Sequence, residues 1–235
     1  MSGKRKPVLR LRAFARSMEG DTEGFDAMEA LSWDLGYEPI TDMPDVCDPM
    51  LTHLVHHVND TCCEHMERIG SADWLCMRCS SSVLDLAYHT VGTVLSGLPQ
   101  IDRARIHTRL AFEQAACTAT VLGPTTYTDH GLEACGRWIA DPQAVTINEL
   151  SEVVDTYPAN AVAVDRIMRN VAAAAAASGD ARECARLAGK AASAAIDARQ
   201  PNPRVADFVR TVDHFMVLSS EVEQATNEQP VVRLR

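Results

Sequence analysis

Aromatic side chains are scarce in this chain, at 5% of 235 residues. Strands rely on aromatic and β-branched residues, so this shortage weighs against a sheet-rich fold. Alanine is abundant instead, and apolar residues recur with the spacing of a helix face. We therefore expect an all-α protein.

Long apolar segments are also missing. The longest stretch without a polar residue, 171–177, is too short and too rich in alanine to cross a bilayer. The basic residues near the start are not followed by the apolar region of a secretory signal. We expect a soluble, cytoplasmic protein with no membrane association, whose cysteines are reduced or bound to metal rather than paired.

Sequence motifs of the common enzyme classes are absent. The chain has no glycine-rich phosphate loop, nucleophile elbow or dinucleotide fingerprint. The run from His53 to His57 lacks the glutamate that zinc hydrolases place between their histidines. A metal-dependent enzyme that uses His53, His56, His57 or His89 with nearby carboxylates remains the competing hypothesis. A solvated polar face is the preferred interpretation of His53 and His57.

Net positive charge is limited to the first residues of the chain. The net charge is −10, yet residues 1–16 contain six basic side chains and no acid, so the remainder carries −16. An acidic body argues against a broad nucleic-acid surface, because phosphate binding needs clustered positive charge. Residues 1–18 are therefore a basic arm that is available to nucleic acid, an acidic partner or the protein's own surface. We favour a solvated or self-docked tail.

Cysteine and histidine, by contrast, are concentrated in one region. Ten of the sixteen such residues lie between Cys47 and His89. Within this region Cys62-x2-His65 is followed, after ten residues, by Cys76-x2-Cys79. Structural zinc sites collect four ligands from two chain segments in this way. The sequence therefore predicts zinc bound by Cys62, His65, Cys76 and Cys79.

Helical periodicity supports this ligand set. Apolar positions in residues 49–69 and 72–95 step by three and four, and Gly70 separates the two segments. Folded back as an antiparallel helical hairpin, the segments place His65 opposite Cys76 and Cys62 opposite Cys79. A local alternative puts Cys76–Cys79 in a knuckle before the second helix, which leaves the ligands unchanged.

Two other interpretations of these cysteines stay open. Free cysteine is often buried, so Cys62, Cys76 and Cys79 would then be small core residues beside His65. An iron-sulfur cluster would use Cys63 or Cys47 as an additional thiolate. A zinc ion with all four predicted ligands would have no open coordination position, as in a structural rather than a catalytic site.

The predicted architecture is an irregular multi-helix bundle in which the metal site joins the hairpin. It consists of the arm, a helical half at 19–125 with the metal site, and an alanine-rich half of helical hairpins at 126–235. Helices are expected at 23–35, 102–122, 132–139, 146–156, 159–178, 180–199 and 203–224. Thr146 with Glu149 and Asp180 with Glu183 have the spacing of capping boxes.

The two ends of the chain resemble each other. Pro7-Val-Leu-Arg-Leu-Arg12 reappears as Pro230-Val-Val-Arg-Leu-Arg235. Both alternate apolar and charged residues, as short half-buried strands do. They would pair with each other or add to a partner's sheet edge, unless the similarity is chance.

These features together predict a non-enzymatic, zinc-stabilised regulator or adaptor that binds another macromolecule, most simply a protein. The helical second half and the basic arm are the candidate contact surfaces. An assembly protein joined through the matching terminal segments is a further hypothesis.

Overall fold

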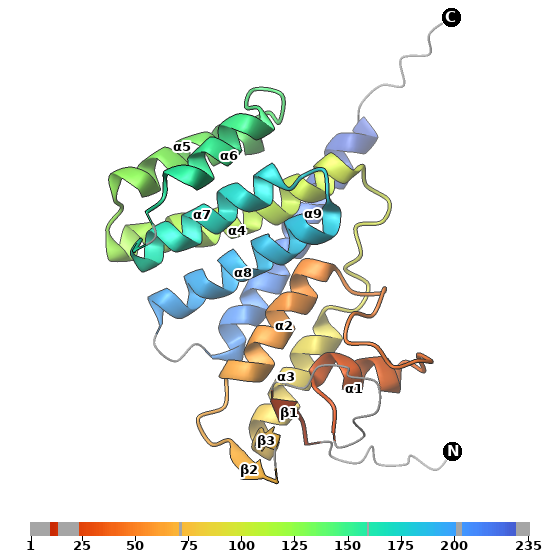
Figure 1. Cartoon of the computed structure of the whole chain (residues 1–235). Coiled ribbons are helices and arrows are strands. Elements are labelled where there is room, and N and C mark those ends of the chain that lie inside the picture. The colour runs from red at the N-terminus through yellow and green to blue at the C-terminus, as the bar shows by residue number, and fades with distance from the viewer. Residues whose placement is uncertain (1–9, 14–23, 71, 159, 201–203, 229–235) are drawn as a thin grey trace, which may run out of the picture. The chain divides into compact units, whose positions relative to one another are not determined.

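The computed structural model describes residues 10–13, 24–70, 72–158, 160–200 and 204–228 (Figure 1). Within these ranges the chain is a mostly helical bundle with one small sheet, which confirms the predicted fold class. The helices are α1 (Ala27–Asp34), α2 (Pro49–Thr61), α3 (Met77–His89), α4 (Gln100–Leu122), α5 (Thr126–Ala140), α6 (Ile147–Thr156), α7 (Ala163–Ala176), α8 (Ala181–Arg199) and α9 (Val205–Glu228). The strands are β1 (Arg12–Ala13), β2 (Glu67–Ile69) and β3 (Ala72–Trp74).

The described residues form two compact units. The first contains the residues up to 94 together with 204–209, and the second contains 95–200 and 210–228. Helix α4 thus belongs with the later helices, whereas the division at residue 125 places it with the earlier ones. The two compact units are defined by contacts in space, whereas the predicted halves were defined by sequence patterns. The two divisions therefore describe different properties of the chain.

Most helices begin where a polar side chain accepts a hydrogen bond from the first turn. Asp26, Asp48, Thr125, Thr146 and Asp180 all do so at the starts of α1, α2, α5, α6 and α8. Such caps satisfy backbone N–H groups that have no partner within the helix. The predicted reciprocal capping box of Thr146 and Glu149 is confirmed.

In the second unit, α4 packs against α8 and α7, and α5 and α6 pack against α7. The face of α8 toward this core consists of small residues that are fully buried, namely Cys184, Ala185, Ala188, Ala191, Ala192 and Ala195. Small side chains let helix backbones approach closely. Accordingly, the Thr118 hydroxyl of α4 donates a hydrogen bond to the Ala195 carbonyl of α8 at 3.0 Å.

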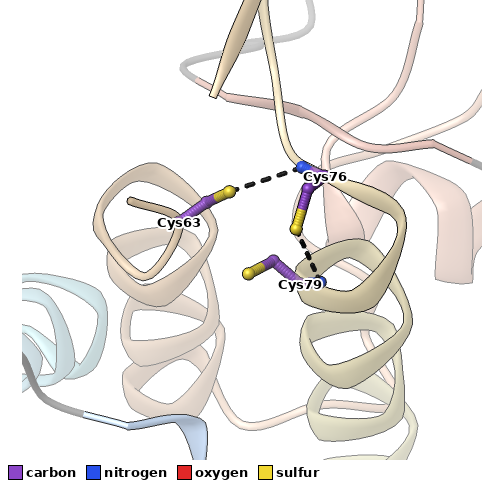
Figure 2. A group of neighbouring side chains, drawn as sticks. All are labelled: Cys63, Cys76 and Cys79. Carbon is purple, nitrogen blue, oxygen red and sulfur yellow. Dashed lines mark hydrogen bonds between the residues drawn. The ribbon is translucent and has the colours of Figure 1, made fainter. Parts of the chain in front are cut away.

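In the first unit, α2 and α3 form the predicted antiparallel pair. The Gly92 N–H, just beyond α3, donates to the Val46 carbonyl just before α2 at 2.8 Å. At the opposite end, Cys63 and Cys76 meet (Figure 2). The predicted length of the first helix was wrong, however. α2 ends at Thr61 rather than Ile69, because residues 67–74 pair as strands about the left-handed Gly70.

The sheet has the order β1-β3-β2, and both pairings are antiparallel. Arg12 lies opposite Trp74, so the end of the first repeated hexapeptide is a strand, as its alternating pattern predicts. The second hexapeptide, 230–235, lies outside the described residues, and pairing between the chain ends stays a prediction. No helix within the described ranges is long and apolar enough to span a membrane.

Candidate metal centre

The first side of the site is the end of α2. Cys62 caps the helix with φ −76° and ψ −14°, and its N–H donates to the Val58 carbonyl at 2.9 Å. Cys63 is the first residue beyond this cap and is buried. The chain then turns through 64–66 into β2, all of whose residues are exposed. Both cysteines are therefore held at a helix end rather than on a helix face.

The second side is the start of α3, which the β2–β3 hairpin returns to the end of α2. Cys76 is the N-cap of α3 and Cys79 lies in its first turn. The predicted knuckle ahead of a helix thus describes Cys76 better than a position inside a helix does. β3 precedes this helix start and is held by β1 on its other edge.

The sulfur atoms of Cys63, Cys76 and Cys79 all lie within 4.8 Å of one another. Figure 2 shows the three side chains gathered between the ends of the two helices. Two backbone N–H groups point into this cluster. The Cys76 N–H donates to the Cys63 sulfur at 3.3 Å, and the Cys79 N–H donates to the Cys76 sulfur at 3.5 Å. Donors of this kind, together with the positive end of the α3 dipole, stabilise negative charge on sulfur.

The thiols differ in acidity. The pKa of Cys76 is lowered, mainly because the Cys79 backbone N–H donates to its sulfur. Burial raises the pKa of Cys79, and hydrogen bonds with the Cys76 and Cys63 thiols raise it further. Burial also raises the pKa of Cys62 to about 11, the neighbouring Cys63 adds to that rise, and a hydrogen bond with Cys79 lowers it. Of these three thiols Cys76 therefore ionises most readily, and a bound cation would stabilise the thiolate forms of the other two.

The structure treats the four predicted ligands differently. Cys76 and Cys79 lie in the cluster, and Cys62 is adjacent to it through its contact with Cys79. His65 is exposed on the turn before β2. Cys63, considered from sequence only as an additional thiolate, is the third member. The predicted set of Cys62, His65, Cys76 and Cys79 stays a prediction.

The position of Cys63 follows from where α2 ends. A helix that continued to Ile69 would place Cys62 and His65 on one face and Cys63 on another. Because the helix stops at Thr61, this relation is lost and Cys63 turns toward α3. The adjacent Cys62-Cys63 pair was the only sequence signal that both residues were candidates.

The histidines of α2 differ in how far they are exposed. His56 is buried, with Nδ1 3.0 Å from Asp26 Oδ2 and Nε2 3.0 Å from the Asp42 carbonyl oxygen. Both ring nitrogens therefore face oxygen atoms of the first unit. His53 and His57 are half-buried, and the His57 ring lies 6.0 Å from the Phe208 ring. Among the described residues, no group of three or more potential metal ligands includes these histidines.

The end of the basic arm docks beside the thiol cluster. Arg10 Nε donates to the Leu75 carbonyl at 2.8 Å, and its guanidinium pairs with Glu67 at 2.8 Å. Leu11 is fully buried, and its N–H donates to the Ser80 hydroxyl of α3 at 3.0 Å. This part of the arm is thus docked on its own chain. Residues 1–9 and 14–18 lie outside the described ranges.

Comparisons with known proteins add no functional information. No family model, curated protein or solved structure matches this chain. The case for function therefore rests on the thiol cluster and on the surfaces around it.

Proposed function

We propose that this chain is a zinc-stabilised helical protein of the cytoplasm that acts as a regulator or adaptor by binding another macromolecule. The observation that carries the proposal is the convergence of three cysteine sulfurs within 4.8 Å at the junction of α2, the β2–β3 hairpin and α3. Two short chain segments that meet through thiolate ligands are typical of structural zinc.

Zinc fits these ligands better than an iron-sulfur cluster does. A tetrahedral zinc ion with Zn–S bonds of about 2.3 Å holds its sulfurs about 3.8 Å apart. The observed upper limit of 4.8 Å is close to that spacing. An iron-sulfur cluster is larger than a single ion and needs its thiolates further apart, so it would require the two segments to separate.

A metal link would support the small sheet of the first unit, because its strands are short. The strands have two or three residues each. Strands of this size bury little apolar surface, and a metal that joins two segments compensates for that. A structural role therefore explains why the cysteines lie at the hairpin that connects α2 and α3.

Binding to a macromolecule is supported by the exposed apolar residues of the second unit. Val121 and Leu122 at the end of α4 are 64% and 48% exposed, and Tyr127 in the first turn of α5 is 41% exposed. Three large apolar side chains are thus exposed within seven residues. Groups of exposed apolar side chains often mark sites where a partner binds. The competing enzyme hypothesis has less support at His56, because this side chain is buried and both of its ring nitrogens lie 3.0 Å from oxygen atoms of the fold.

The experiment measures metal and partner together. Purified protein should contain one zinc per chain by elemental analysis, and Cys79→Ser should abolish the zinc and lower the melting temperature of the first unit. Cys117→Ser is the matched control, because Cys117 is exposed on α4. Wild-type protein without stoichiometric metal would overturn the zinc part of the proposal.

The partner is tested with a second variant. Leu122→Glu adds charge to the exposed apolar segment and should leave zinc content unchanged. A protein that co-purifies with the wild type and with Cys117→Ser, but is lost with Leu122→Glu, supports the adaptor role. Hydrolytic activity that disappears when His53 and His57 are replaced would favour the enzyme instead.

A further inference from the structure

The three clustered thiols leave one coordination position to assign. Structural zinc takes four protein ligands in a tetrahedron. Cys63, Cys76 and Cys79 supply three sulfurs, two from the start of α3 and one from beyond the end of α2. Cys63 is so far the only ligand that would connect the end of α2 to α3. A fourth ligand from the same segment as Cys63 would give two ligands from each side. Cys62 and His65 are the two candidates in that segment.

Cys62 already contacts the cluster. Its thiol lies near enough to Cys79, Cys63 and Cys76 for each of them to shift its pKa, although its sulfur is outside the group whose members all lie within 4.8 Å of one another. It is half-buried, and it is held in place by the helix-capping hydrogen bond of its N–H to the Val58 carbonyl.

His65 is placed less well. It lies two residues beyond Cys63 on an exposed turn, where the chain has begun to run toward the exposed strand β2. Neither its ring nitrogens nor the Cys62 sulfur are within the mutual distance that joins Cys63, Cys76 and Cys79. The two candidates differ in burial, because Cys62 is half-buried at the end of α2 next to Cys63, whereas His65 is exposed on the turn.

The local charges also suit four thiolates. Zinc with four thiolates carries a net charge of −2, which needs compensation where it is partly buried. The N–H groups of Cys76 and Cys79 donate to sulfur, and the positive end of α3 faces the site. The first turn of α3 contains no acidic side chain. Aspartate or glutamate side chains are common at helix N-termini, where they interact with the positive end of the helix dipole. In α3 the thiolates would make this interaction instead.

We propose that Cys62 is the fourth ligand, so that the site is a tetrathiolate zinc centre of Cys62, Cys63, Cys76 and Cys79. This inference rests on the proposed function, because it assumes that the thiol cluster binds zinc. It makes His65 a surface residue with no part in metal binding. It also makes two adjacent residues ligands of one ion. Cys62 caps α2 and Cys63 lies beyond the cap, so the two side chains leave the backbone in different directions.

The direct test is X-ray absorption at the zinc edge of the wild-type protein. Four sulfurs at about 2.3 Å are expected. Three sulfurs and one nitrogen at about 2.0–2.1 Å would overturn the inference and leave the zinc site itself intact. Protein that binds no zinc at all would instead overturn the proposed function. The two failures are therefore distinguishable, and this measurement does not depend on the folding of a variant.

Matched variants give a second test. Cys62→Ser should weaken zinc binding by more than about 10-fold in a chelator competition, because loss of a ligand exceeds the effect of losing a supporting hydrogen bond. In the cobalt-substituted protein it should remove about a quarter of the sulfur-to-metal absorption, since one of four thiolates is gone. His65→Ala should match the wild type in both measurements. The opposite result, with His65→Ala impaired and Cys62→Ser unchanged, would show that His65 is the fourth ligand and would overturn the inference.

Discussion

Gly131 lies within α5 at a point where the neighbouring helices leave no room for a side chain. A Cβ atom there would be 2.2 Å from the Tyr157 hydroxyl oxygen and 2.7 Å from Met168 Cγ. The Tyr157 side chain cannot move freely, because its hydroxyl donates to the Tyr127 carbonyl at 3.0 Å. We therefore expect Gly131→Ala to destabilise the protein by about 1–3 kcal/mol through overpacking, as measured by urea unfolding.

Gly136, in the same helix, provides the control. A Cβ atom at that position would meet only the Phe112 ring, at 3.7 Å or more, which is an ordinary contact. Gly136→Ala should then stabilise the helix by about 0.5–1 kcal/mol, because alanine loses less backbone entropy than glycine. Equal effects of the two substitutions would contradict the packing argument.

Single residues also decide the chemistry of the first unit. Cys62 and Cys63 are adjacent, yet one caps α2 and the other lies beyond it. The two ring nitrogens of His56 lie close to the Asp26 carboxylate and to the Asp42 carbonyl oxygen. His56 therefore links α2 to the start of α1 and to the segment that contains Asp42. A residue type that suggests catalysis in the sequence thus also holds segments of the first unit together.

At the scale of elements, the β2–β3 hairpin sets the distance between the two halves of the thiol cluster. Gly70 has φ +65°, a conformation that costs other L-residues about 1–2 kcal/mol. Nothing lies within 4 Å of a Cβ placed there, so a substitution acts through the backbone alone. Gly70→Val should therefore strain the turn without creating a clash.

The expected result of Gly70→Val is an increase in the zinc dissociation constant of about 10-fold, the equivalent of about 1.4 kcal/mol. Gly70→Asn should stay near the wild type, because asparagine tolerates the left-handed region. Competition with a coloured chelator measures both. Equal affinities for the valine and asparagine variants would show that the hairpin does not control the site.

At the scale of the whole molecule, the two compact units differ in what stabilises them. The core of the second unit is built from long helices with small buried residues, of which α8 is the clearest case. The first unit contains short helices, a small sheet and the thiol cluster. Zinc is therefore expected to matter for one unit and not for the other.

Removal of zinc by a chelator should accordingly be local. Hydrogen exchange followed by mass spectrometry should show faster exchange in α2, β2, β3 and α3, and little change in α4, α7 and α8. The wild-type protein with zinc restored is the control. Uniform loss of protection across both units would show that the metal stabilises the whole molecule.

Much of the helical fold could be predicted from local sequence, because caps and breakers act over a few residues. Thr146 and Glu149 predict the start of α6, and Gly123 with Pro124 predicts the end of α4. The closely packed face of α8 was also expected from its spaced small residues, and these are fully buried. Each of these features depends on residues close together in the chain.

The sequence alone determined a helical chain with a concentration of thiols between α2 and α3, because composition and short-range spacing carry that information. Only the tertiary structure decided where α2 stops and which cysteines meet. β3 is sandwiched between β2 and β1, and β1 comes from about sixty residues earlier in the chain. That long-range pairing stabilises strands too short to be recognised from their own pattern. The strand pairing ends the helical pattern that the sequence shows in residues 49–69. It also brings Cys63 close to Cys76 and Cys79.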